Sequence, residues 1–293
     1  MKDPTRPFSS DFNDESSLCL DSRRRVRSFR MTVNCLVLDY DGTISPLNSS
    51  RNESRVPVET QVVLQKIIKH VPIVVVTTKD LSFVEPRTPF ACAWSAVSGL
   101  ERKIGDITQK RNGYEHKLRN VSVAIEYAKS HMRFSGVEIE EKLDMSHRPI
   151  AFCLDWRQSK DPLAAMKEVY VVVDYCKSLG LKLVKYEGQP FLDVYPMSID
   201  KGVALKEMLK ELKLEKGILY MGDSEADNPA FAMADVGIGV VHGEYYVQSL
   251  ACDYFVKFED VSPFLSRLLE NQFLFESDFP MIWMNVKGRG RDA

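Results

Sequence analysis

The chain has 293 residues, of which 44% are hydrophobic and 27% are charged, and its net charge at pH 7 is −2. This length and apolar content are enough for one large core and a smaller second domain. The near-neutral charge gives no electrostatic reason to expect binding to nucleic acid or to an anionic membrane. No apolar run approaches the roughly 20 residues of a membrane span, and six cysteines without a Cys-x-x-Cys pair are typical of reduced thiols in a cytoplasmic protein.

Residues 1–31 are predicted to form a disordered basic extension. They are rich in Asp, Ser and Pro, and arginines cluster between residues 23 and 30. A twin-arginine export signal is the alternative, but the apolar run that follows is better explained as the first core strand. Met31, just ahead of that strand, is an alternative initiator.

The first apolar run, residues 33–38, predicts a buried parallel strand. It ends at Asp39 and Asp41, which are two positions apart and therefore face the same way. Open α/β sheets bind ligands at the carboxyl ends of their strands. Two close carboxylates favour a bound cation, and the oxygen-preferring Mg²⁺, usually with a phosphate, fits best. These residues alone leave open a solvated Asp-Tyr-Asp-Gly turn.

Three later segments also place polar side chains directly after an apolar strand or at the start of a helix. They are Thr77 after residues 73–76, Lys201 before the helical pattern 203–212, and Asp223 with Asp227 after residues 218–221. An ammonium group at the positive end of a helix is unfavourable unless an anion lies beside it. A surface lysine and an ordinary strand threonine are the alternatives for Lys201 and Thr77.

The stretch between Thr77 and Lys201 is far longer than one αβ unit needs, which indicates an inserted domain. After a third core strand near residues 94–97, helical spacing appears in 117–134 and 163–179, and strand patterns in 137–143, 149–156, 181–186 and 191–195. The predicted fold class is α/β, a Rossmann-like parallel-sheet core with an inserted α+β cap in the order α-β-β-α-β-β. The expected boundaries are 32–106 and 197–275 for the core, 107–196 for the cap and 276–293 for a C-terminal extension.

The four motifs, in this order, resemble those of the haloacid dehalogenase (HAD) superfamily of phosphatases, whose signature is a strand followed by Asp-x-Asp-Gly-Thr. The insert resembles the large C2-type cap of subclass IIB, which closes over the core site. The resemblance implies that Asp39 is the nucleophile and Asp41 the general acid and base. It also implies that Thr77 and Lys201 bind phosphate, that Asp39, Asp223 and the carbonyl of Asp41 hold Mg²⁺, and that Asp227 orients these ligands.

Two branches of the superfamily are similar to different parts of the chain. Leu-Asp-Tyr-Asp-Gly-Thr-Ile-Ser-Pro at 38–46 and the Gly-x-x-x-Glu-x-Lys pattern at 136–142 resemble trehalose-6-phosphate phosphatases, as does Arg157 in Asp-Trp-Arg. Asp193 stands where that group has Glu. Gly-Asp-Ser-Glu-Ala-Asp-Asn at 222–228 instead resembles sucrose-phosphate, mannosylphosphoglycerate and phosphoglycolate phosphatases. From the cap, Glu141, Lys142 and Arg157 are the predicted substrate-binding residues, with a merely solvated sheet face as the alternative.

The sequence therefore predicts a Mg²⁺-dependent phosphomonoesterase that acts on a small phosphorylated metabolite, foremost a sugar phosphate such as trehalose-6-phosphate, through an aspartyl-phosphate. The alternatives are a phosphoglycolate or mannosylphosphoglycerate phosphatase, a phosphomutase of the same superfamily, and a non-catalytic metabolite-binding protein. The expected partner is the small metabolite, without nucleic acid or membrane, in the cytoplasm. The sequence leaves the oligomeric state open.

Overall fold

The computed structural model describes residues 29–47, 49–132, 136–186, 189–243 and 250–285. The predicted disordered tail, apart from its last three residues, and the last eight residues of the predicted C-terminal extension lie outside these ranges. Among the described residues, no helix is both long enough and apolar enough to cross a membrane.

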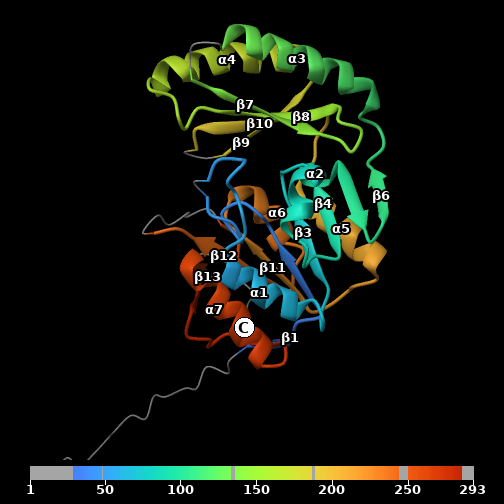
Figure 1. Cartoon of the computed structure of the whole chain (residues 1–293), viewed down its shortest axis with the longest axis vertical. Coiled ribbons are helices and arrows are strands. Elements are labelled where there is room, and N and C mark those ends of the chain that lie inside the picture. Colours follow the sequence, from blue (N-terminus) through green and yellow to red (C-terminus); the bar gives the residue numbers. More distant parts are fainter. Residues whose placement is uncertain (1–28, 48, 133–135, 187–188, 244–249, 286–293) are drawn as a thin grey trace, which may run out of the picture.

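A mostly parallel sheet forms the core of the described part of the chain (Figure 1). Its strands, in order across the sheet, are β15 (Ile282–Met284), β13 (Tyr254–Lys257), β12 (Val236–Val241), β11 (Ile218–Gly222), β2 (Cys35–Leu38), β3 (Ile73–Val76), β4 (Ala93–Ala96), β5 (Glu101–Ile104) and β6 (Ile107–Lys110). The six strands from β13 to β4 run parallel, whereas β15, β5 and β6 are joined to the sheet by antiparallel pairing. β2 lies at the centre, between β3 and β11, so the residues that follow it reach the middle of the sheet edge.

Helices cover both faces of this sheet, and the alternation of side chains along the strands divides the core into two clusters. Leu36 and Leu38 pack on the face of α1 (Val58–Ile67) and α7 (Val261–Glu270). Cys35 and Val37 pack on the opposite face, which is covered by α5 (Lys201–Leu212) and α6 (Asn228–Phe231). Helices therefore shield both faces of the sheet from solvent. This agrees with the continuous apolar runs of its strands, such as Ile73–Val76. The remaining core helix is α2 (Leu81–Val84), and single 3-10 turns occur at Glu85–Arg87, Val97–Gly99, Glu115–Lys117, Glu225–Asp227 and Phe258–Asp260.

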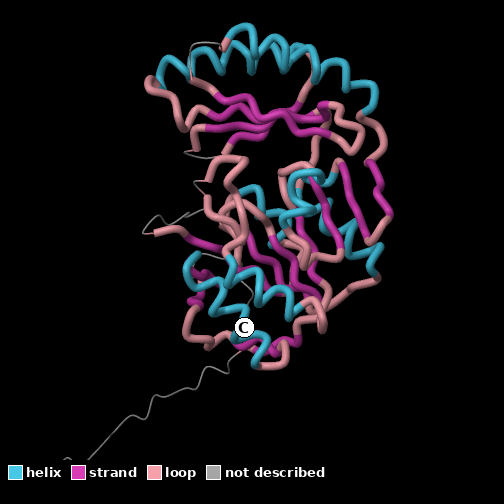
Figure 2. Tube along the Cα trace, viewed as in Figure 1, coloured by secondary structure: helices cyan, strands magenta, loops and turns pink. Residues whose placement is uncertain are grey.

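The inserted segment forms an antiparallel sheet with two helices on one face. Its strands are ordered β7 (Glu138–Leu143), β8 (Pro149–Asp155), β10 (Phe191–Tyr195) and β9 (Lys182–Lys185), and its helices are α3 (Leu118–His131) and α4 (Pro162–Ser178). Buried apolar residues of α3, α4 and the inner strands form a separate core cluster. Figure 2 shows that the cap strands lie between the cap helices and the core. The predicted fold class, with its order α-β-β-α-β-β in the insert, is confirmed.

The sheet extends beyond the segments that the sequence assigned to the core. β6 begins at Ile107, the predicted first residue of the cap, yet it pairs with β5 in the core sheet. β15 lies in the predicted C-terminal extension and pairs with β13. β1 (Arg30–Thr32) pairs with β14 (Leu274–Glu276) in a two-stranded sheet of its own. These short edge strands are largely solvated on one side and lack the apolar runs that made the central strands recognisable.

Candidate active site

The loop after β2 directs two carboxylates into one cavity. Tyr40, between Asp39 and Asp41, is fully buried, and its hydroxyl donates a hydrogen bond to the carbonyl of Ser54 at 3.2 Å. With Tyr40 anchored in the core, Asp39 and Asp41 both line the cavity on the other side of the backbone. The expectation that residues two apart share a face is therefore met here.

Two glycines allow the neighbouring strand ends to approach this loop. Gly42 has a φ of +71°, and a Cβ atom there would lie 2.0 Å from Oδ2 of Asp223. At Gly222, the last residue of β11, a Cβ would lie 2.4 Å from Cγ of Asp227. Since real Cβ contacts are never this short, any side chain at either position would push the acidic residues apart.

Lys201 is buried between two of these carboxylates. It is the first residue of α5, only 2% exposed, and its Nζ lies 2.8 Å from Oδ1 of Asp39 and 2.7 Å from Oδ1 of Asp227. These anions supply the negative charge that an ammonium group needs at the positive end of a helix. They raise the pKa of Lys201, against the lowering effect of burial, so the side chain is a permanent cation.

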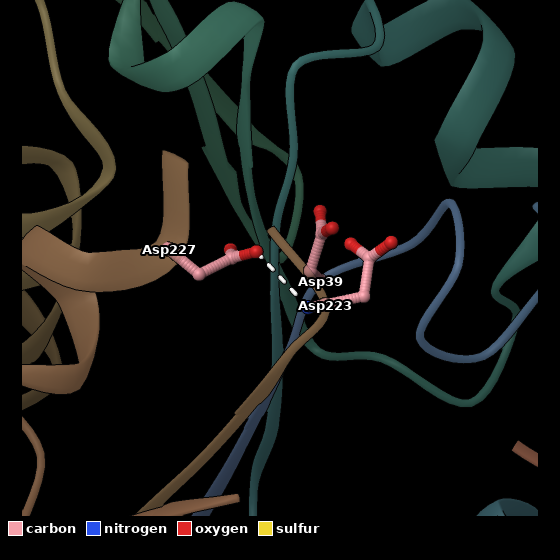
Figure 3. Close-up of side chains that lie close together, drawn as sticks. All are labelled: Asp39, Asp223 and Asp227. Atoms are coloured by element: carbon pink, nitrogen blue, oxygen red, sulfur yellow. Dashed lines mark hydrogen bonds between the residues drawn. The ribbon is translucent and has the colours of Figure 1, made fainter. Parts of the chain in front are cut away.

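Asp227 uses its oxygens to fix the loop after β11. Besides Lys201, its carboxylate accepts hydrogen bonds from the Tyr220 hydroxyl at 2.5 Å and from the backbone N–H groups of Asp223 and Ser224 at 3.1 and 3.0 Å. Figure 3 shows Asp227 approaching from its own segment toward the other two acids, with the bond to the Asp223 backbone dashed. Its oxygens are thus largely committed to protein donors.

Asp39 and Asp223 are suited to hold a divalent cation. Their carboxylates point the same way and lie side by side in Figure 3, and one oxygen from each of Asp39, Asp223 and Asp227 falls within 4.8 Å of the others. Burial raises the pKa of Asp39 to about 7, against the lowering effect of Lys201. Burial and repulsion from Asp39 raise the pKa of Asp223 well above its usual value. Carboxylates crowded in this way are stabilised in the ionised form by a hard, oxygen-bound cation, so this donor set fits Mg²⁺.

Thr77 follows β3 as predicted, but its side chain does not line the cavity. It is 1% exposed, and its hydroxyl accepts a hydrogen bond from the backbone N–H of Lys79 at 3.2 Å. Thr78 and Lys79 line the cavity instead. In this structure Thr77 therefore shapes the turn that presents the next two residues.

The cavity has a volume of about 530 Å³, and residues from the strand ends of the core and from the sheet of the cap line it. Alternate residues of β7, namely Glu138, Glu140 and Lys142, line it. Glu141 lies on the other face of the strand, where its carboxylate pairs with Nζ of Lys129 on α3 at 2.7 Å. The structure thus brings Lys142 into the cavity and leaves Glu141 outside, with Glu140 in its place. The two-residue period of a strand separates Glu141 from Lys142.

Lys142 is part of a buried polar group in the cap wall. Its Nζ lies 2.5 Å from Oδ1 of Asp193, whose other oxygen accepts hydrogen bonds from the hydroxyls of Tyr186 at 2.7 Å and Tyr195 at 3.0 Å. Asp193 raises the pKa of Lys142, against the lowering effect of burial. This cation is therefore neutralised inside the wall while still reaching the cavity.

Arg157 lies at the rim of the cavity, where cap and core meet. Its guanidinium pairs with Asp155 at 2.6 Å and lies 5.3 Å from the ring centre of Phe191. It also donates to the carbonyl of Leu47, in the loop after β2, at 3.3 Å. The predicted cap residue is thus in contact with the core.

Sequence reasoning missed two core cations in the cavity wall, Arg51 and Lys79. Arg51 donates hydrogen bonds to Asp80 and, at 2.5 Å, to Oε1 of Glu140. Lys79 lies 3.0 Å from both Glu140 oxygens and 3.5 Å from Oδ2 of Asp41. The place of Lys79 two residues after the motif threonine Thr77 was a usable signal, whereas Arg51 lies in a loop whose pattern carries none.

Comparison with known proteins identifies the family to which this chain is similar. Residues 37–242 match the sequence model of the trehalose-phosphatase family. Trehalose-phosphate phosphatase B of Arabidopsis thaliana is 25% identical over 289 residues, which covers 89% of this chain and 75% of the plant protein.

Solved structures share the fold. A trehalose-6-phosphate phosphatase related protein has a TM-score of 0.65 at 18% identity, with 81% of this chain and 99% of that chain covered. A sugar phosphatase of HAD subclass IIB has a TM-score of 0.56 at 14% identity, with 82% and 100% covered.

The fold is that of the HAD superfamily, as the sequence predicted. The matched region extends over most of the chain, from β2 through the whole cap to β12. The chain belongs to the trehalose-phosphatase family and is a sugar-phosphate phosphatase.

Proposed function

We propose that the chain hydrolyses the phosphomonoester of a disaccharide, trehalose-6-phosphate in the first place, with Asp39 as the nucleophile. One observation carries the assignment of the reacting residue. Asp39 is only 4% exposed, touches Lys201, and lies beside Asp223 at the floor of the cavity with Asp41 next to it. A carboxylate in this position can attack phosphorus and be regenerated.

In the first step an Asp39 oxygen forms a bond to phosphorus while the bond from phosphorus to the ester oxygen breaks. The leaving oxygen keeps the electron pair and takes a proton from Asp41, which acts as the general acid. In the second step Asp41 takes a proton from water as the water oxygen attacks phosphorus, and the bond from phosphorus to Asp39 breaks. Inorganic phosphate and the original carboxylate result.

The ammonium group of Lys201, which Asp227 holds in place, can stabilise the negative charge that develops on the phosphoryl oxygens. Magnesium, held by Asp39, Asp223 and the carbonyl of Asp41, would offset the repulsion between the nucleophile and the phosphoryl group. Thr78 and the backbone after β3 offer further donors on the same side of the cavity.

The substrate class is supported by the cap wall and by the family. The cavity has room for more than a phosphate, and the cap side is lined by ion-paired side chains together with Tyr186 and Phe191. Such a wall offers hydrogen bonds to hydroxyl groups and an aromatic surface for a sugar ring. The match to trehalose-phosphate phosphatases makes trehalose-6-phosphate the first candidate.

The test is phosphate release by the purified full-length chain with Mg²⁺ from trehalose-6-phosphate, sucrose-6-phosphate, mannosylphosphoglycerate and phosphoglycolate. We expect kcat/KM for trehalose-6-phosphate to exceed the others by about tenfold or more. A preference for another of these esters would refute trehalose-6-phosphate as the substrate but would leave the proposed phosphomonoester hydrolysis intact. An isomerised sugar phosphate without free phosphate would show a phosphomutase and contradict the proposal.

A further inference from the structure

A chain of charged side chains joins the cap to the core beside Asp41. Glu140 of cap strand β7 accepts hydrogen bonds from Arg51 and Lys79 of the core. Arg51 also pairs with Asp80, and Lys79 also pairs with Asp41. We call Arg51, Lys79, Asp80 and Glu140 the Glu140 latch.

We propose that Glu140 is a positioning residue. By binding the core cations of this latch, it docks the cap onto the core and thereby holds Lys79 against Asp41. Closing the cap and completing the acid–base side of the site are then one event. The inference rests on the proposed function only in the role that it gives to Asp41.

On the core side of the latch, Asp80 and the neighbouring Phe83 are held by contacts that do not involve Glu140. Asp80 caps α2 by accepting a hydrogen bond from the backbone N–H of Phe83 at 3.0 Å, and it is fully buried. The ring of Phe83 lies under both cations, 4.5 Å from the Arg51 guanidinium carbon and 5.4 Å from Nζ of Lys79. The core therefore presents a pair of cations that can bind one carboxylate from the cap, and this carboxylate fixes Lys79 beside Asp41.

The ion pairs of the latch are shielded from solvent. The side chains of Glu140 and Lys79 are 16% and 14% exposed, and that of Arg51 is 26% exposed. Although burial raises it, the cations Lys79, Lys142 and Arg51 hold the pKa of Glu140 to about 2, so the carboxylate is charged at neutral pH. Ion pairs that are partly desolvated and share several hydrogen bonds are stronger than isolated surface pairs.

The latch differs in its consequences from a direct sugar contact by Glu140. A sugar ligand would matter only for substrates that carry a sugar, and chiefly for KM. A latch matters for every phosphate ester, because it sets the position of Lys79 and the closure of the cap. Its effect should also vanish once Lys79 has been removed.

The kinetic experiment compares Glu140→Gln, Lys79→Met and the double variant on trehalose-6-phosphate and on p-nitrophenyl phosphate. We expect each single variant to lower kcat on both substrates by about tenfold, and the double variant to be no worse than either single one. Glu141→Gln, one residue along the same strand but outside the cavity, is the matched control and should keep wild-type kcat. Losses confined to KM for the sugar phosphate, or fully additive losses, would overturn the latch.

A second measurement is independent of activity. Small-angle X-ray scattering of the full chain should show a larger radius of gyration for Glu140→Gln and for Arg51→Met than for the wild type and Glu141→Gln. Because Arg51→Met breaks the latch from the core side, it tests the same contact without changing the cap. Unchanged scattering in both variants would contradict the latch, even if the wild type proved active. A wild type without phosphatase activity would refute the proposed function but leave this result valid.

Discussion

The floor and the cap wall of the cavity are both rich in charge, but they balance it differently. On the floor, the carboxylates of Asp39, Asp223 and Asp227 gather around one buried ammonium, that of Lys201, and Asp41 beside them pairs with Lys79. On the cap side each cation has its own carboxylate, as in Lys142 with Asp193 and Arg157 with Asp155. The excess negative charge of the floor suits a dication and a reacting phosphoryl group, whereas the internally paired wall suits a neutral polyol.

The largest expected effect is on the floor, at the nucleophile. Asp39→Asn removes the group that forms the bond to phosphorus, so kcat should fall by about 1,000-fold or more. Lys201 keeps its partner Asp227, so the fold should persist. Steady-state phosphate release measures the first point, and circular dichroism melting measures the second. Retention of a tenth of the wild-type kcat would remove Asp39 from this role.

Activity should also require a metal ion, and the residues that bind this ion should all lie on the floor. Chelation with EDTA should abolish turnover, and added Mg²⁺ should restore it. Ca²⁺ should not restore it, because its longer bonds and looser coordination misplace the reacting oxygen. Asp223→Asn should raise the Mg²⁺ concentration needed for half-maximal activity by about tenfold or more. Full activity after exhaustive chelation would contradict a metal on the floor.

In the cap wall the largest effect should be on stability rather than on chemistry. Lys142→Met leaves the charge of Asp193 buried with two tyrosine hydroxyls, and we expect a loss of about 3–5 kcal/mol in the free energy of unfolding. Adding Asp193→Asn removes the charge but keeps an acceptor for the tyrosines, so the double variant should recover most of this loss. Urea unfolding of the full chain measures both. A double variant as unstable as Lys142→Met would show that the pair does not act as a unit.

The smallest expected effect is on substrate affinity, and it distinguishes the cap wall from the floor because it should depend on the substrate. Arg157→Ala should raise KM for trehalose-6-phosphate by about tenfold, because charge-assisted hydrogen bonds to the substrate are lost. Hydrolysis of p-nitrophenyl phosphate, which has no sugar, should change little. Arg148→Ala removes another cap arginine, exposed and paired with Asp144, and serves as the control. Equal losses on both substrates would assign Arg157 to cap closure instead.

The floor was predictable from sequence because each of its residues follows a strong backbone signal. Asp39 and Asp223 come directly after apolar strands whose carboxyl ends must meet at one sheet edge, and Lys201 opens a helix. The wall was less predictable, since a strand with charges on both faces does not reveal which face is buried. Glu141 was the predicted residue, although the Gly-x-x-x-Glu-x-Lys pattern at 136–142 has its glutamate at Glu140. The pairing of Glu141 with Lys129 shows that Glu141 faces the helices.

Tertiary contacts account for the rest. Arg51 becomes important only because the fold brings its loop against α2 and β7, which are distant from it in sequence. Thr77 has the predicted place in the chain, but the turn after β3 directs Thr78 and Lys79 toward the cavity. The pattern of residue types along the chain contains no information on the Arg51 contacts, and it does not show which of residues 77–79 enter the cavity.

The central strand β2 has a consequence for how the chain acquires its site during synthesis. Its partner β11 follows the whole cap in the sequence, and the register pairs Leu36 with Leu219. As the chain leaves the ribosome, the whole cap is synthesised before β11 and the Asp223 that follows it. Until then, β2, which leads to Asp39, has one edge unpaired. Such non-local pairing slows folding and leaves an edge open to aggregation. Catalytic competence should therefore be one of the last properties that a newly made molecule gains.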